Sequence, residues 1–213
     1  MYIPDTLSEI TLAQYQKYIK YQKDNDDENF LAIKMIEVFC GLRNHTVRSM
    51  KAKSIRDICK ILTDMFNEKP ELVKQFEMKG ITYGFVPDLE NITFGEYIDL
   101  DTFIGDFENM HKAMAVLYRP ITQSYKDKYT IEKYTGDKFS DMINMPMDAV
   151  FSSILFFYHL GMELSTVMMN SLETQEEEEN LVQYLSSIES GDGINQFGVY
   201  LDKMLQDLKI SLN

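Results

Sequence analysis

The chain has 213 residues, a formal net charge of -13 and a pI near 4.6. Such an excess of negative charge works against nucleic-acid binding, because a protein must bring cations to the phosphates to displace their counterions. Hydrophobic residues make up 45% of the sequence, which is enough for a packed core and argues against a globally disordered chain. One local group of basic side chains departs from the acidic character: Arg43, Arg48, Lys51, Lys53 and Arg56.

Residues 1–5 have neither the basic region nor the apolar run of a signal peptide, so we expect none. The uncharged segment 149–162 is shorter than the roughly 20 apolar residues that a membrane-spanning helix needs, and it predicts a buried core helix instead. Cys40 and Cys59 lie in apolar helical patterns without the paired spacing of a zinc site. They predict two buried thiols.

Apolar spacing predicts helices through the first third of the chain. Thr11 is the predicted N-cap of the first helix, which should stop at the acidic run 24–28. Residues 29–40 are apolar around most of the helix circumference and predict a second, deeply buried helix. Ser54 is the predicted cap of a third helix, whose apolar side chains recur at helical spacing as far as Phe66.

Pro70 is expected to open a short helix that ends at Gly80. The alternating, β-branched and aromatic stretch 81–86 then predicts a strand, and 128–134 is its expected partner. A two-stranded sheet alone is only marginally stable, so we expect these strands to pack against helices.

Between these strands, Thr93 and Glu96 form a capping-box pattern at the start of a helix. A second helical stretch is expected to begin near Asp101 and to end at Arg119, because a residue that precedes a proline, here Pro120, disfavours the helical backbone conformation.

Pro146 should begin a long apolar helix that reaches about Leu172. The glutamate run 176–179 follows, and Gly191 to Gly193 separates one further helical pattern from a last amphipathic one. We therefore predict a mainly α protein. A helical bundle-like domain with a small two-stranded β element would occupy residues 1–172, and a C-terminal helical segment, 173–213, would follow it.

Catalytic patterns are absent from the sequence: there is no nucleophile elbow, no zinc-protease helix and no phosphate-binding glycine loop. His111 and His159 fall within apolar helical faces and predict core residues. A metal-dependent hydrolase using Glu96, Asp99, Asp101 and His111 is an alternative, but positions 99 and 101 do not share a helix face. We predict a non-enzymatic protein without a catalytic residue, cofactor or metal.

Four segments of the central block are distinctive: GITYGFVPDL at 80–89, ITFGEYIDLD at 92–101, MHKAMAVLYRPI at 110–121 and YTIEKY at 129–134. On these segments the block resembles uncharacterised proteins of tailed bacteriophages, encoded among the genes that build the virion. The resemblance covers roughly residues 80–172 and names no catalytic residue.

Within such phages, the Thr-x-Gly-Glu-x-x-x-Leu opening at Thr93 and the Leu-Tyr-Arg-Pro helix end look like tail assembly chaperones, which hold the tape-measure protein until the tail tube forms. Ring or adaptor proteins below the portal and cargo packed with the genome are the alternatives. A further alternative is an acidic DNA mimic. The resemblance implies other phage proteins as partners, a homo-oligomer as one form, and the host cytoplasm, or the virion, as location.

The 14 methionines suit adaptable apolar interfaces, although ordinary core filling explains them as well. The terminal helix could dock on a neighbouring subunit or pack on its own domain. Arg119, at a predicted helix end, could cap that helix or reach a partner carboxylate. The candidate interaction residues are Phe94, Glu96, Tyr97, Arg119, Phe197, Leu201, Met204 and Leu205.

Overall fold

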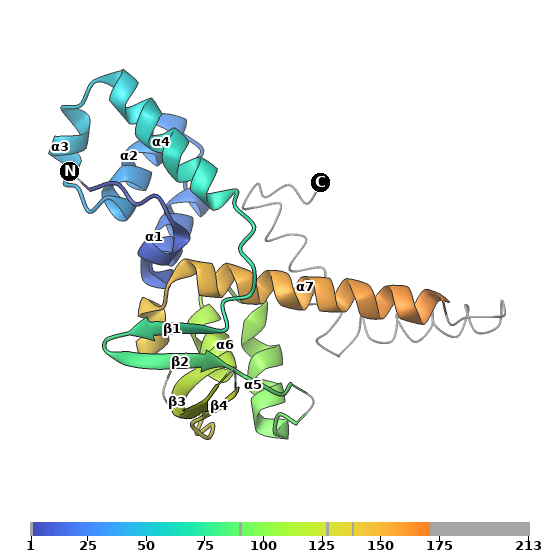
Figure 1. Ribbon diagram of the computed structural model, residues 1–213. Coiled ribbons are helices and arrows are strands. Elements are labelled where there is room, and N and C mark those ends of the chain that lie inside the picture. Colours follow the sequence, from blue (N-terminus) through green and yellow to red (C-terminus); the bar gives the residue numbers. More distant parts are fainter. Residues whose placement is uncertain (1, 90, 127, 138, 171–213) are drawn as a thin grey trace.

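The computed structural model describes residues 2–89, 91–126, 128–137 and 139–170, with 160–170 as helix backbone (Figure 1). The predicted segment 173–213, with Phe197, Leu201, Met204 and Leu205, lies outside the described residues. The elements are η1 (Leu7–Glu9), α1 (Leu12–Lys23), α2 (Glu28–Phe39), α3 (Asn44–Arg48), α4 (Ala52–Phe66), β1 (Gln75–Met78), β2 (Ile81–Phe85), α5 (Phe94–Ile104), α6 (Met110–Leu117), β3 (Tyr118–Tyr125), β4 (Lys128–Ile131), η2 (Ser140–Asn144) and α7 (Met147–Asn170).

Helices α1 to α4 form one end of the molecule (Figure 1). The predicted cap at Thr11 is confirmed: its hydroxyl accepts a hydrogen bond from the Gln14 amide, and the Gln14 side chain returns one to the Thr11 backbone. Helix α2 occupies the predicted place, but most of its side chains are half-buried, so the prediction of deep burial was wrong. Helix α4 begins at Ala52, before the predicted cap at Ser54.

A short backbone pairing joins this helical part to the rest of the molecule. The amide of Leu12 donates to the carbonyl of Met145 at 3.0 Å, and the amide of Met147 donates to the carbonyl of Ile10 at 2.9 Å. These four side chains are fully buried. The pairing therefore fixes the start of α7 against the start of α1 in the centre of the core.

A four-stranded antiparallel sheet in the order β1-β2-β3-β4 replaces the predicted two-stranded element. Strand β2 matches the prediction for 81–86, and β4 covers the first part of 128–134. The two are not partners, however, because β3 lies between them and pairs with both. The protein is therefore an α+β fold, and the prediction of a two-stranded β element was wrong.

The two unexpected strands have identifiable causes. The predicted short helix from Pro70 does not form, and the alternating residues of β1 instead make a hairpin with β2. Lys79 and Gly80 are its turn, with φ of 52° and 74°, as a two-residue hairpin requires. The predicted helix end at Arg119 is nearly right, because α6 passes directly into β3 at Tyr118. Pro120 then sits within β3, where few large apolar residues follow to indicate a strand.

Tyr118 joins the sheet to α7. Its side chain is fully buried, and its hydroxyl donates to the carbonyl of Val73 at 2.8 Å, with the carbonyl of Ala149 at 3.3 Å. The ring contacts Phe76 and Phe85 with centroids 5.3 Å away in each case. Burial raises the pKa of this hydroxyl far above its ordinary value. Tyr118 therefore acts as a neutral donor that ties β1, β2 and α7 together.

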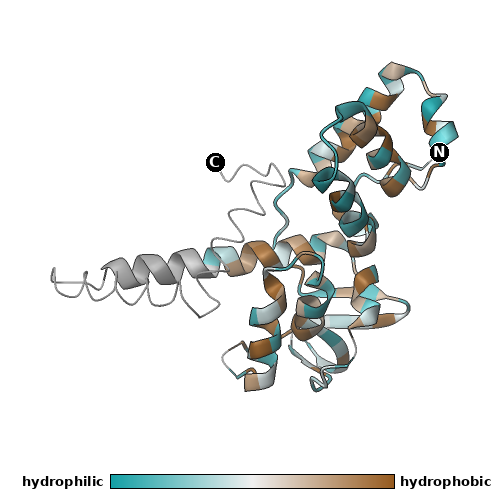
Figure 2. Ribbon diagram, turned by 180° about the vertical axis from the view of Figure 1, so that it is seen from behind, coloured by the Kyte–Doolittle hydropathy of each residue, from teal (hydrophilic) through white to brown (hydrophobic). Residues whose placement is uncertain are grey.

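Helix α7 starts in this core and then leads away from the sheet (Figure 1). Figure 2 shows that its first turns are predominantly apolar, as the predicted core helix requires. Within the part of the chain that the structure describes, no helix has the length and apolar character needed to cross a membrane.

The ring of Tyr129, on β4, lies across Gly84 of β2, and its hydroxyl donates to the carbonyl of Phe85 at 2.7 Å. A Cβ at position 84 would lie 2.5 Å from the Cε2 atom of that ring and 3.0 Å from the Cγ1 atom of Ile121. Glycine is therefore required here for close packing of a side chain over the strand.

We expect Gly84→Ala to lower the free energy of unfolding by about 1–3 kcal/mol, because the Tyr129 ring must move and weaken its hydrogen bond. Urea unfolding followed by circular dichroism measures the change. Gly95→Ala is the control, since a Cβ there meets no atom within 4 Å. Equal midpoints for the two variants would contradict the packing role of Gly84.

Candidate functional site

Helix α5 opens with the capping box predicted at Thr93. The Thr93 hydroxyl accepts from the Glu96 amide at 3.3 Å, and the Thr93 amide donates to the Oε2 atom of Glu96 at 2.7 Å. One carboxylate oxygen of Glu96 thus caps the N-terminus of its own helix.

The other carboxylate oxygen, Oε1, pairs with a guanidinium nitrogen of Arg119 at 2.7 Å. The Glu96 and Arg119 side chains are only 6% and 12% exposed. Arg119 is the second residue of β3, so this ion pair fastens the first turn of α5 to the sheet. Two of the candidate interaction residues therefore bind each other inside the protein instead of facing a partner.

Asp99, one turn further along α5, makes a second contact between this helix and the sheet region. Its Oδ2 atom accepts a hydrogen bond from the Tyr134 hydroxyl at 2.5 Å. Burial, together with the neighbouring Asp99 carboxylate, raises the pKa of Tyr134 and keeps the hydroxyl protonated as a donor. Tyr134 follows β4, so the inner face of α5 is held by two different parts of the sheet region.

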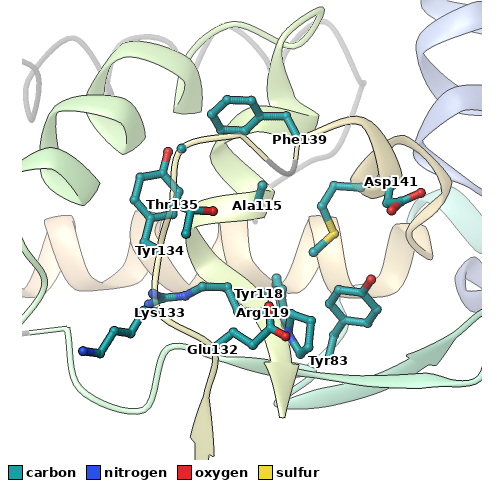
Figure 3. Close-up of a pocket in the computed structure, with 13 residues that line it drawn as sticks. Tyr83, Ala115, Tyr118, Arg119, Glu132, Lys133, Tyr134, Thr135, Phe139 and Asp141 are labelled. Atoms are coloured by element: carbon teal, nitrogen blue, oxygen red, sulfur yellow. The ribbon is translucent and has the colours of Figure 1, made fainter. Parts of the chain in front are cut away.

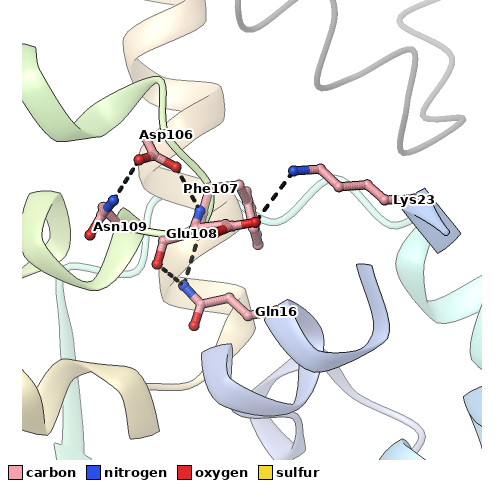
Figure 4. Close-up of polar contacts among 6 residues, drawn as sticks. All are labelled: Gln16, Lys23, Asp106, Phe107, Glu108 and Asn109. Atoms are coloured by element: carbon pink, nitrogen blue, oxygen red, sulfur yellow. Dashed lines mark hydrogen bonds and ion pairs between the residues drawn. The ribbon is translucent and has the colours of Figure 1, made fainter. Parts of the chain in front are cut away.

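The far end of α5 is held by the connection to α6, which is fastened to α1 (Figure 4). The Gln16 side chain donates to the carbonyls of Phe107 and Glu108 at 2.8 and 3.2 Å, and Lys23 lies 3.4 Å from the Glu108 carboxylate. Asp106 accepts from the Glu108 amide at 2.9 Å and so shapes the turn that leads into α6. Helix α5 is consequently fixed at both ends.

The outer face of α5 carries three large apolar side chains. Phe94, Tyr97 and Ile98 are 77%, 39% and 45% exposed. Their spacing of i, i+3 and i+4 places them on the same side of the helix, and Figure 2 shows the apolar bands along this helix. Phe94 and Tyr97 were predicted as interaction residues, whereas Ile98 was missed although its spacing from Phe94 is the signal. We call Phe94, Tyr97 and Ile98 the α5 apolar face.

The other exposed large apolar side chains among the described residues do not share one element. They are Tyr2, Ile61, Ile81 and Tyr125. Single exposed apolar residues of this kind are ordinary on protein surfaces, whereas three on one rigid helix face are typical of an interaction site.

A small cavity is lined in part by Arg119 and Tyr134 (Figure 3). Its volume of about 60 Å³ gives room for a few water molecules and not for an organic ligand. The Arg119 side chain extends from β3 toward Tyr134 and Lys133 (Figure 3). Its Nε atom is buried without a hydrogen-bond partner among the described residues, which a water in this cavity would satisfy.

The residues of the metal-hydrolase alternative are not arranged as a site. Glu96 is engaged by Thr93 and Arg119, and Asp99 accepts from Tyr134. Across the described ranges, no group of three or more His, Cys, Asp or Glu side chains could hold a metal ion. His111 is half-buried, and burial followed by the charge of Lys112 lowers its pKa.

Three further residues that were predicted to be buried, His159, Cys40 and Cys59, are less enclosed. His159 is exposed on α7. The free thiols of Cys40 and Cys59 are half-buried, and burial raises the pKa of Cys40 to about 11 and also raises that of Cys59. At neutral pH both thiols are therefore protonated and weakly nucleophilic.

No protein-family model, curated protein or solved structure matches the chain.

Burial alone would raise the pKa of Glu96, but the hydrogen bonds from Thr93 and the nearby Arg119 outweigh it and leave the pKa below its usual value. A carboxyl group with a lowered folded-state pKa stabilises the protein above its unfolded pKa, about 4.3 for glutamate. That stabilisation is lost as the pH falls through the folded-state pKa.

We therefore expect Glu96→Gln to cost about 2 kcal/mol at pH 7, because the amide can still cap α5 but leaves the Arg119 charge unpaired. The difference from wild type should shrink as the pH falls below about 4.3. Urea unfolding between pH 7 and pH 3 measures it. Glu68→Gln, at an exposed position, should change stability by less than about 0.5 kcal/mol. A pH-independent difference would rule out the proposed role of the Glu96 charge.

Proposed function

We propose that this protein acts by binding another protein through the α5 apolar face, and that it serves tailed-phage assembly in the manner of a tail assembly chaperone. The observation that carries the proposal is the exposure of Phe94, Tyr97 and Ile98 on one side of a helix whose other side is fastened to the sheet.

Binding through such a face is physically favourable for two reasons. Aromatic and aliphatic anchors at i, i+3 and i+4 are the pattern by which a helix fits an apolar groove of a partner, and aromatic anchors dominate interface energies. In addition, the Glu96–Arg119 pair and the Tyr134–Asp99 hydrogen bond already order the helix. Little conformational entropy then remains to be lost on binding.

The resemblance of residues 80–172 to tailed-phage proteins supports the assembly role, and the α5 apolar face lies within that block. A chaperone of this kind covers apolar surface of the tape-measure protein before the tail tube encloses it. The partner surface that fits is therefore an apolar groove between helical segments of the tape-measure protein, which the anchors of α5 can fill.

We expect Phe94→Ala combined with Ile98→Ser to weaken binding to the tape-measure protein about tenfold or more, because both anchors are removed. Co-expression with the tagged tape-measure protein of the same phage, followed by quantified co-purification, measures the loss. Tyr125→Ala is the matched control, since Tyr125 is an equally exposed aromatic residue outside α5. The proposed face is excluded if the double variant co-purifies as well as wild type or if the control loses as much.

The chaperone role also predicts where the protein is found. It should be abundant in infected cells and absent from purified virions, because a chaperone leaves when the tail tube forms. Mass spectrometry of both samples, with the major capsid protein as the internal reference, decides this. A fixed copy number in the virion, near twelve or a small multiple, would instead indicate a ring protein.

A further inference from the structure

The surface of α3 and the first half of α4 is strongly basic, although the protein is acidic. Residues 43–60 contain six Lys or Arg and a single Asp, so this stretch carries +5 and the rest of the chain -18. All six cations are exposed. We call them the basic face: Arg43, Arg48, Lys51, Lys53, Arg56 and Lys60.

These cations are not paired within the described part of the protein. Among the side chains that the structure describes, the ion pairs involve Lys23, Lys34, Lys79 and Arg119 and no member of the basic face. Carboxylates are plentiful in an acidic protein. Ion pairs among the described residues therefore do not explain why these six cations are present.

Local structure does not supply that cause. Lys53, Arg56 and Lys60 follow one stripe of α4, on the side opposite to Ile58 and Leu62, which are buried. Lysine at the N-cap and in the first turn of a helix also opposes the helix dipole. Lys51 and Lys53 therefore gain nothing from the dipole of α4, and the exposed stripe is available to an anionic partner.

We propose that the basic face binds the glutamate-rich segment 173–179 of a second copy of this chain. That segment reads ETQEEEE, with five carboxylates and no cation. Its four consecutive glutamates, 176–179, are the longest uninterrupted run of acidic residues in the sequence, and each copy of the protein carries both halves of the contact.

The direction of α7 works against a contact within the same copy. Helix α7 starts beside α1, where the Met147 amide donates a hydrogen bond to the Ile10 carbonyl, and leads away from α3 and the first turns of α4 (Figure 1). Its 24 residues make a rod of about 36 Å. From Asn170 to Glu179 the chain spans at most about 30 Å even when fully extended. The segment is therefore too short to fold back to the start of α7, and the contact we propose joins two copies.

A contact between two different surfaces of the same protein builds a ring or an open chain of copies when it runs head-to-tail, and a two-fold dimer when two copies exchange the segment reciprocally. Exposed ion pairs are individually weak, and the Debye screening length at physiological salt is only about 8 Å. The association is therefore moderate in affinity and salt-dependent.

A polypeptide fits this face better than a nucleic acid does. DNA would extend its phosphates beyond the basic face, and the rest of the chain has a net charge of -18, so repulsion opposes it. The run of four glutamates is short enough to stay on the α4 stripe of Lys53, Arg56 and Lys60.

A charge exchange between two variants tests the proposal by sedimentation velocity of the full chain in 150 mM NaCl. The first variant is Lys53→Glu/Arg56→Glu, and the second carries Lys at positions 176 to 179 in place of Glu. Wild type should self-associate, and 500 mM NaCl should weaken this at least tenfold. Each variant alone should be weakened at least tenfold, whereas an equimolar mixture should regain association, because the unchanged glutamate run of the first variant can bind the unchanged basic face of the second.

Lys126→Glu/Lys128→Glu is the matched control, with the same change of charge at two other exposed lysines, and it should associate like wild type. The proposal is overturned if wild type is monomeric in 150 mM NaCl, if the mixture does not recover, or if the control is weakened equally. Binding of a labelled 20-nucleotide duplex that is tighter than self-association, measured by fluorescence anisotropy, would also overturn it in favour of nucleic acid.

Discussion

The arrangement of this molecule depends on how the Glu96 carboxylate is divided between two tasks. One oxygen caps α5 through the Thr93 amide, and the other holds the Arg119 guanidinium at the start of β3. A capping carboxylate is ordinarily a local device that acts within four residues. Here it also joins residues 23 positions apart, so the start of a helix and the start of a strand are fixed by one group. Since α6 runs directly into β3, fixing Arg119 also limits how α6 can turn.

This attachment explains why α5 shows apolar side chains to solvent without loss of order. A helix that rolls by a fraction of a turn could bury Phe94 and Ile98 and expose Leu100 and Phe103 instead. The ion pair at Glu96 and the Asp99 hydrogen bond one turn later together prevent that rotation. Burial of the two carboxylates therefore costs desolvation energy but determines which face of the helix is outward.

The helices were largely predictable from the sequence because their signals are local. The caps at Thr11 and Thr93 act on the following turn, and both are present as predicted. The sheet was not predictable in the same way, because β2 and β3 pair Phe85 with Tyr118 across the intervening helices. Periodicity also could not predict which face of α5 is buried, since apolar side chains occur on both of its faces. Only the nonlocal partner of Glu96 decides which of them are buried.

The two proposed surfaces lie in different parts of the molecule, on α5 and at the α3–α4 end (Figure 1). They also differ in chemistry, since one is apolar and held rigidly while the other is cationic and consists of long side chains in solvent. Their contributions to binding respond to opposite conditions, because salt screens ion pairs but does not weaken apolar contacts. A partner held at α5 would therefore not compete with copies that join through the basic face. With the contact we propose, the separation of charge along the chain, +5 in residues 43–60 and -18 elsewhere, would order copies along a partner without altering the surface that holds it.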